Sequence, residues 1–307
     1  MEPVLSASQI SKSFGKYSII EDLSLSIDQK IVYGLVGLNG AGKTTLIRLL
    51  LGILKIDNGG ISVLGHDPWK HEDAFYKQIG VVMENDGFLG NLTIRDNLKI
   101  FAAAKSISWA ETESYLNEYW RETFILSSSK KVKFLSRGQR MQCGLCRAFL
   151  GWPKVCLFDE PLVALDVEAY EHFKKMVIIA RDKGSAVLIS SHQLEAIDDL
   201  CDRVGILRDK QVHELDHLTR IAGTYWIIES DSSERCKEQL IRVGAKNIEV
   251  HLESVSFTID NENDAIPEVV KSLVMADIRI NQVRKEDSEF STAIRRLYKK
   301  NQQGTSN

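Results

Sequence analysis

The chain has 307 residues, 44% hydrophobic and 26% charged, an ordinary globular composition with enough length for one large and one small domain. A formal net charge of −3 gives no overall attraction for nucleic acid, so no nucleic-acid partner is expected. No apolar run approaches the length of a membrane span, and the N-terminus lacks the cationic start and apolar core of a signal peptide, which favours a cytoplasmic location.

The first 51 residues predict strands that lead into a phosphate-binding loop. Leu23, Leu25 and Ile27 alternate with polar residues, as in a half-buried strand. Residues 31–36 form a short apolar run, and residues 44–51 have the pattern of a helix. Between them, residues 37–44 match GxxxxGK[ST] completely, in the strand–loop–helix context that this motif requires.

This loop carries the chemistry of phosphate binding. Glycines let backbone N–H groups turn toward a phosphate, and the following helix directs its N-terminus at the same anion. We expect Lys43 to neutralise charge on the terminal phosphates and Thr44 to give an oxygen to Mg²⁺. The loop residues predicted to contact the nucleotide are Gly37, Asn39, Gly40, Gly42, Lys43, Thr44 and Thr45.

The middle of the chain predicts an α/β core with an inserted group of helices. Residues 79–83, 155–158 and 186–190 are candidate buried strands separated by helical patterns, which indicates a largely parallel sheet. Residues from about 86 to 150 lack strand runs and are predicted to form a helical insert. Cys143 and Cys146 form a CxxC within it, and without a second pair or a nearby histidine we interpret them as buried packing residues.

An acidic pair ends the strand at 155–158. Asp159 is expected to hold Mg²⁺ through its water shell, and Glu160 to polarise the attacking water as general base. The alternative is an acidic strand-to-loop turn with no catalytic role. The phosphate loop upstream favours the catalytic interpretation.

A composition change near residue 216 predicts a domain over residues 1–215 and an accessory module over residues 216–307. In the module, strands are predicted at 225–228, 248–252, 255–259 and 278–283, with helices at 233–243 and 266–274, the second having Pro267 near its start. The order βαββαβ is typical of a ferredoxin-like α+β fold. A further helix is predicted over 289–300.

The segment Leu135-Ser136-Arg137-Gly138-Gln139 lies between the phosphate loop and the acidic pair. These motifs, in this order, resemble those of the ATP-binding cassette (ABC) ATPases over roughly residues 4–215. The resemblance implies a P-loop cassette with a mainly parallel sheet, antiparallel N-terminal strands and a helical insert. It also implies hydrolysis of ATP with Mg²⁺.

The resemblance assigns roles to further residues. Ser136, Gly138 and Gln139 match the signature segment that closes on the γ-phosphate bound by a second subunit. Asp166 matches a loop that crosses the dimer interface, and His192 matches a histidine that contacts the γ-phosphate.

Phe14 stands where the family stacks an aromatic ring on adenine, with simple packing as the alternative. Two positions depart from the family's pattern. Arg137 replaces the usual glycine of the signature and adds bulk and charge at the expected dimer interface. Glu84 replaces a glutamine at the end of strand 79–83, where a carboxylate would lie near Mg²⁺ and the attacking water. An acidic residue there resembles the bacitracin-resistance and lantibiotic self-protection exporters, and neutral drift is the alternative.

The resemblance thus implies the ATPase subunit of a membrane exporter for a peptide antibiotic or a similar compound. Its expected partners are a second copy or a homologous ATPase subunit, and a separate polytopic membrane subunit that holds it at the inner face of the membrane. The alternatives are a soluble ATPase of the same superfamily acting on ribosomes or DNA, and a regulatory ATP-binding partner with weak hydrolysis. The single cassette and the absence of sustained heptads favour the transporter.

Overall fold

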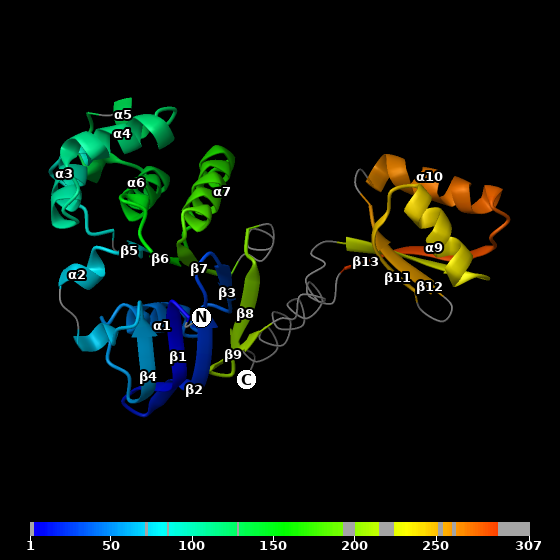
Figure 1. Ribbon diagram of the computed structural model, residues 1–307, viewed down its shortest axis with the longest axis horizontal. Helices are drawn as coiled ribbons and strands as arrows, with labels where there is room; N and C mark the ends of the chain where they lie inside the picture. Colours follow the sequence, from blue (N-terminus) through cyan, green and yellow to red (C-terminus); the bar gives the residue numbers. More distant parts are fainter. Residues whose placement is uncertain are drawn as a thin grey trace, which may run out of the picture. The chain divides into compact units, whose positions relative to one another are not determined.

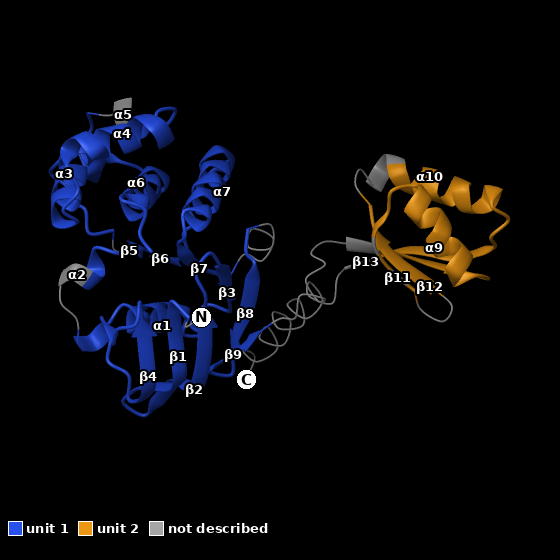
Figure 2. Cartoon of the chain, in the orientation of Figure 1, with its two compact units in different colours: residues 1–215 blue, residues 216–307 orange. Residues whose placement is uncertain are grey.

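A computed structural model describes residues 3–70, 73–84, 86–127, 129–192, 200–214, 224–250, 254–259 and 262–287. The chain divides into two units, residues 1–215 and 216–307, which Figures 1 and 2 show. Each unit has its own sheet topology and its own hydrophobic core.

A six-stranded sheet forms the centre of the first unit. Its strands lie in the order β5-β6-β7-β3-β8-β9, and every neighbouring pair is parallel except β8–β9. The side chains of β3, β6 and β7 are buried throughout, as expected for strands covered on both faces. The strands are β3 (Val32–Val36), β5 (Ile79–Val82), β6 (Val155–Asp159), β7 (Ala186–Ser191), β8 (Arg203–Arg208) and β9 (Gln211–Glu214).

A second, antiparallel sheet carries the N-terminal strands. Its order is β2-β1-β4, with β1 (Leu5–Phe14) between β2 (Tyr17–Ile27) and β4 (Asn58–Val63). Leu23, Leu25 and Ile27 are buried while the residues between them are exposed, which confirms the predicted alternation. Their core is shared with helix α1 (Lys43–Leu50) and with strands of the larger sheet.

The helices predicted between the strands are present. Between β5 and β6 the chain forms α3 (Ile94–Ala104), α4 (Trp109–Tyr119), α5 (Phe124–Ser127), the 3₁₀ turn η2 (Val132–Phe134) and α6 (Arg137–Phe149). Figure 1 shows α3, α4 and α6 gathered at the upper left of the view, above β5 and β6. The turn η1 (Pro68–Lys70) and α2 (Asp73–Tyr76) precede β5, and α7 (Val167–Asp182) joins β6 to β7. Cys143 and Cys146 are buried in α6, and burial raises the pKa of the Cys143 thiol to about 12.

The second unit has the predicted ferredoxin-like topology. It consists of β10 (Thr224–Ser230), α9 (Ser233–Arg242), β11 (Lys246–Val250), β12 (Ser254–Thr258), α10 (Glu262–Met275) and β13 (Ile280–Asp287). The sheet is antiparallel in the order β11-β12-β10-β13. Its core includes Ile228, Leu240, Phe257 and Leu273.

Some predicted boundaries in this unit are wrong. The last strand begins at Ile280 rather than at 278 and continues to Asp287, because its pairing with β10 extends over polar residues that lack a strand-like apolar pattern. Helix α10 begins at Glu262, so Pro267 lies inside the helix and not near its start. The helix predicted at 289–300 lies outside the described residues. Of the helices that the structure describes in both units, none is long and apolar enough to cross a membrane.

Close packing of α6 on β5 generates a stability prediction. A Cβ added at Gly80 of β5 would lie 2.4 Å from the carbonyl oxygen of Ala148 and 2.8 Å from Cγ of Pro153. Gly80→Ala should therefore push α6 away from the sheet and lower the free energy of unfolding by about 1–3 kcal/mol, measured by denaturant unfolding.

Gly144→Ala is the matched control, since Gly144 lies on α6 in the same interface. Its new methyl group would meet the Val82 methyl groups at 3.9 and 4.0 Å, an ordinary contact. This variant should be as stable as the wild type or more so, because alanine favours helix over glycine by about 1 kcal/mol. Equal losses in both variants would contradict the packing explanation.

Candidate functional site

The phosphate loop joins β3 to α1 at the carboxyl edge of the parallel sheet. Gly40 and Gly42 have φ of +83° and +110°, in the left-handed region that favours glycine. A Cβ at Gly37 would lie 2.9 Å from the Leu207 carbonyl oxygen of β8. Asn39 and Gly40 are exposed at the tip of the loop, and Thr45 is half-buried in the first turn of α1.

Lys43 is held over this loop. Its side chain is only 5% exposed, and Nζ donates hydrogen bonds to the carbonyl oxygens of Gly37 (2.7 Å) and Leu38 (3.2 Å). Nζ also lies 3.1 Å from Oε1 of Glu160. The ammonium group thus has a defined position between the loop and the end of β6.

Asp159 is bound from two sides. Thr44 Oγ1 donates to Oδ2 at 2.7 Å, and Ser190 Oγ donates to Oδ1 at 2.7 Å. The neighbouring Glu160 N donates to Ser190 Oγ at 3.0 Å, so one buried hydroxyl contacts both acidic residues. The sequence analysis did not identify the role of the Ser190 hydroxyl. This role arises because Asp159 of β6 pairs with Ser190 of β7 in the sheet, and no local sequence pattern indicates that pairing.

Glu160 lies between two basic groups. His192 Nδ1 is 2.7 Å from Oε2, and Lys43 Nζ approaches Oε1. The φ of Glu160 is +50°, an uncommon conformation for a residue with a side chain. Such strain persists where the surroundings hold it, and here both carboxylate oxygens and the backbone N–H have partners.

A cleft of about 870 Å³ opens beside these residues. Glu84, which follows β5, lines it together with Thr44, Asp159 and Glu160. Basic residues of α6, including Arg137, also line the cleft. Glu84 therefore borders the same cleft as Thr44 and Asp159.

The signature segment has a local structural role. Ser136 is the N-cap of α6: its Oγ accepts from Gln139 N at 3.2 Å, and Gln139 Oε1 accepts from Ser136 N at 3.1 Å, which is a capping box. A Cβ at Gly138 would lie 2.5 Å from the Ala164 carbonyl oxygen, so α6 approaches the loop before α7 closely. Asp166 caps α7, accepting from Ala169 N at 2.9 Å.

Several other predicted residues are not among those that line this cleft, although Leu135 and Arg137, on either side of Ser136, line it. Ser136, Gln139 and Asp166 are not among the described residues that line it. Phe14 is 47% exposed at the hairpin between β1 and β2, opposite Tyr17, with Lys12 Nζ 5.6 Å from its ring centroid. The Phe14 ring is thus exposed at the surface and is not packed in the core.

The oxygen groups at the end of β6 fit a magnesium ion. No cluster of three or more His, Cys, Asp or Glu side chains suited to a metal occurs among the residues that the structure describes. Mg²⁺ prefers one or two carboxylates completed by phosphate oxygens and water. The Thr44 hydroxyl and the Asp159 carboxylate, 2.7 Å apart, are oxygen donors of this kind.

Comparisons with known proteins agree with this geometry. The ABC transporter family model matches residues 20–163. The bacitracin transport ATP-binding protein BcrA of Bacillus licheniformis is 32% identical over 226 residues, which cover 72% of each chain. YdbJ of Bacillus subtilis, an uncharacterized ABC transporter ATP-binding protein, is 31% identical over 91% of this chain and 90% of its own length. A solved ATP-binding subunit of an ABC transporter, 28% identical, superposes with a TM-score of 0.66 over 71% of this chain and 92% of its own. The chain therefore belongs to the ABC transporter family, as an ATP-binding and ATP-hydrolysing subunit.

Proposed function

We propose that this subunit powers a membrane exporter of a peptide antibiotic or a similar compound through ATP-driven closure of two ATPase subunits. The observation that carries the proposal is the convergence of Lys43, Thr44, Asp159, Glu160 and His192 at one edge of the sheet. The similarity to a bacitracin transport protein supports export over the alternative of action on ribosomes or DNA.

Lys43 would bind the terminal phosphates of ATP. Its three ammonium donors now face two loop carbonyls and Glu160, so a phosphate oxygen would take the place of the Glu160 carboxylate. Thr44 and Asp159 would hold Mg²⁺, and Glu84 would add a carboxylate at the edge of that site. The ion supplies positive charge to the β- and γ-phosphates as they separate.

Glu160 would act as the general base. A water molecule between Glu160 and the γ-phosphate would give its proton to the carboxylate as its oxygen bonds to phosphorus. The bond between phosphorus and the β–γ bridging oxygen would break, giving ADP and phosphate. His192, 2.7 Å from Glu160, orients the carboxylate and can contact the γ-phosphate.

A second copy would complete each site. Ser136 is exposed at the N-terminus of α6, where backbone N–H groups and the helix dipole favour an anion. Under two-fold symmetry each copy would present Ser136 and Gly138 to the γ-phosphate bound by the other. ATP contacted by both copies favours the closed pair, and a shift from 1:99 to 99:1 requires about 5.5 kcal/mol of differential affinity.

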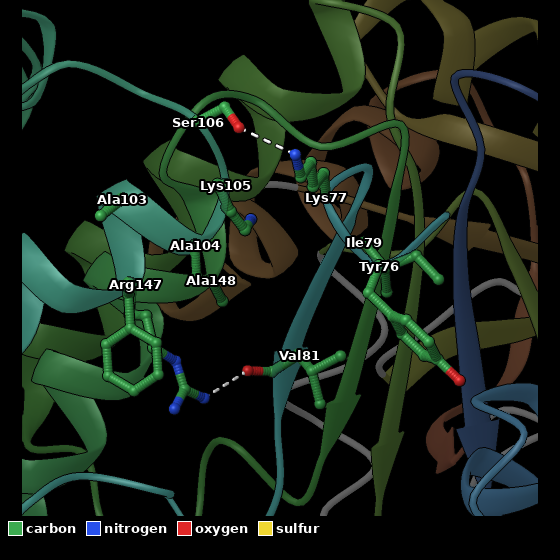
Figure 3. Close-up of a pocket in the computed structure, with 11 residues that line it drawn as sticks. Tyr76, Lys77, Ile79, Val81, Ala103, Ala104, Lys105, Ser106, Arg147 and Ala148 are labelled. Carbon is green, nitrogen blue, oxygen red and sulfur yellow. Dashed lines mark hydrogen bonds between the residues drawn. The ribbon is translucent and has the colours of Figure 1, made fainter. Parts of the chain in front are cut away.

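A second groove opens in the first unit. It has a volume of about 710 Å³ and lies between the start of β5 and the C-terminal ends of α3 and α6 (Figure 3). Lys77 Nζ donates to Ser106 Oγ at 2.8 Å along its rim, and Arg147 donates to the Val81 carbonyl oxygen at 2.8 Å. Burial, with a smaller contribution from Arg147, lowers the pKa of Lys105 to about 8. We infer that this groove receives a segment of the polytopic subunit.

The base assignment predicts a trapped dimer. Glu160→Gln should bind MgATP but hydrolyse it at least about 100-fold more slowly, because the amide cannot accept the proton. Size-exclusion chromatography should show a monomer without nucleotide and a dimer with ATP. Wild-type turnover in Glu160→Gln would show that another residue is the base.

The position of Ser190 predicts that its hydroxyl contributes to catalysis as well as to stability. Ser190→Ala would leave Asp159 Oδ1 and Glu160 N without their partner, so kcat should fall about tenfold with a loss of about 1–2 kcal/mol in stability. Ser185→Ala is the matched control, since this buried serine precedes the same strand and donates to the Pro153 carbonyl oxygen at 2.5 Å, away from the site. It should lose similar stability and keep wild-type kcat. Equal turnover in the two variants would remove the catalytic role of Ser190.

If the groove receives the membrane subunit, a substitution that fills it should weaken assembly with that subunit and leave nucleotide binding unchanged. Ala103→Trp would fill the groove, whereas Ala110→Trp places the same side chain at an exposed position on α4. Each variant is co-expressed with a polytopic protein encoded beside this chain, and copurification and ATP affinity are measured. Only Ala103→Trp should reduce copurification, and ATP affinity should be unchanged in both. Normal copurification of Ala103→Trp would place the docking surface elsewhere.

A further inference from the structure

Two arginines on one face of α6 point to the loop that follows β5. Arg140, Gly144 and Arg147 are separated by three or four residues, so they share one face of the helix. Gly144 lies against the Val82 methyl groups, which brings this face directly onto β5. The two arginines therefore lie beside Asp86 and Phe88, where the chain leaves the strand.

The Asp86 carboxylate accepts two hydrogen bonds from Arg140. Arg140 Nε donates to Oδ2 at 2.7 Å and Nη2 donates to Oδ1 at 3.0 Å, and Phe88 N also donates to Oδ1 at 3.0 Å. The Asp86 side chain is 16% exposed. Burial acts to raise the pKa of Asp86, but the Arg140 hydrogen bonds and charge outweigh it, so the pKa is lowered and the carboxylate stays ionised.

Arg147 holds the same loop by its backbone. It donates to the carbonyl oxygens of Val81 (2.8 Å) and Asp86. Its guanidinium group lies over the rings of Phe88 and Phe101, with distances to the centroids of 5.2 and 4.9 Å. These contacts do not require the Asp86 side chain, so the loop should stay docked on α6 when that carboxylate is neutralised.

The Asp86–Arg140 pair lies close in sequence to two residues of interest, Glu84 and Arg137. Glu84, two residues before Asp86, lines the cleft shared with Thr44 and Asp159. Arg137, at the first position of α6, lies one helical turn before Arg140. Asp86 and Arg140 line this cleft as well, so the pair connects the segment that follows β5 to the first turns of α6.

We propose that Asp86 is a positioning residue that, through Arg140, fixes the signature end of α6 relative to Glu84, so that the two move together when ATP binds. The proposal rests on the two-subunit function proposed above. Neutralising Asp86 would leave the nucleotide contacts of its own chain intact. It would, however, allow the signature segment to vary in orientation, which weakens its contact with the nucleotide of the second copy.

The test compares dimer formation in a hydrolysis-deficient background. Full-length Glu160→Gln is the reference, and Asp86→Asn is added to it. We expect the monomer to bind MgATP within about twofold of the reference, while the protein concentration needed for half-dimerisation rises about tenfold, as for the loss of one charge-assisted contact. Both are measured by fluorescence titration with an ATP analogue and by analytical ultracentrifugation. In the wild-type background, kcat should fall with little change in KM.

Two controls separate positioning from general destabilisation. Glu113→Gln removes another carboxylate–arginine pair of the helical insert, with Arg95, which is exposed and away from the cleft. It should change neither dimerisation nor kcat. The exchange Asp86→Arg with Arg140→Asp restores opposite charges and should recover most of the dimerisation lost in Asp86→Asn.

Each outcome bears on the proposal. Failure of the Glu160→Gln reference to dimerise with ATP would overturn the two-subunit function and the positioning role with it. Dimerisation of the reference with no change in Asp86→Asn would overturn the positioning role alone. Weaker dimerisation accompanied by an equal loss of ATP affinity, or without recovery in the exchanged pair, would make Asp86 a structural residue only.

Discussion

The site depends on the two hydrogen bonds that hold the Asp159 carboxylate. Thr44 binds it from the first turn of α1, and Ser190 binds it from β7, so a single buried acid connects the phosphate loop to two parallel strands. A carboxylate that is only 6% exposed needs such donors, because burial without them is costly. The order β6-β7-β3 makes this possible, since the carboxyl ends of these neighbouring parallel strands meet at one edge.

Local patterns predicted the parts of this site that lie within a few residues of one another. The phosphate loop and the Asp159-Glu160 pair are each continuous in sequence, and each needs only a strand before it. Ser190 and Asp86 are different, because their partners lie 31 and 54 residues away and depend on which strands and helices become neighbours. The sheet order has no local signal. In the second unit, periodicity predicted the topology. Polar residues at the end of β13 and the four residues of α10 that precede Ile266 concealed the true boundaries.

The signature segment illustrates why residue type alone does not establish function. Ser136 with Gln139, and Asp166 with Ala169 N, would be good helix caps in any protein. Their presence is explained locally, without a second subunit. Gly138 is more informative, because only a residue without a Cβ permits the close approach to Ala164. That approach joins the N-terminus of α6 to the loop ending at Asp166, which are the two segments that the family resemblance assigns to the subunit interface.

Both departures from the family's pattern, Arg137 and Glu84, line the same cleft. Arg137 occupies the first position of α6 with helical backbone, so this position does not need the conformational freedom of glycine. Glu84 adds a negative charge where the family has a neutral side chain, in a cleft that already contains Asp159 and Glu160. Arg137 adds a positive charge to the same cleft. The negative charge of Glu84 and the positive charge of Arg137 cancel. The total charge of the cleft is therefore the same as with glutamine and glycine at these two positions. Asp86 lines this cleft as well and is paired with Arg140, so Glu84 is one of four carboxylates there, and the basic residues Arg137, Arg140 and Arg147 of α6 line the same cleft.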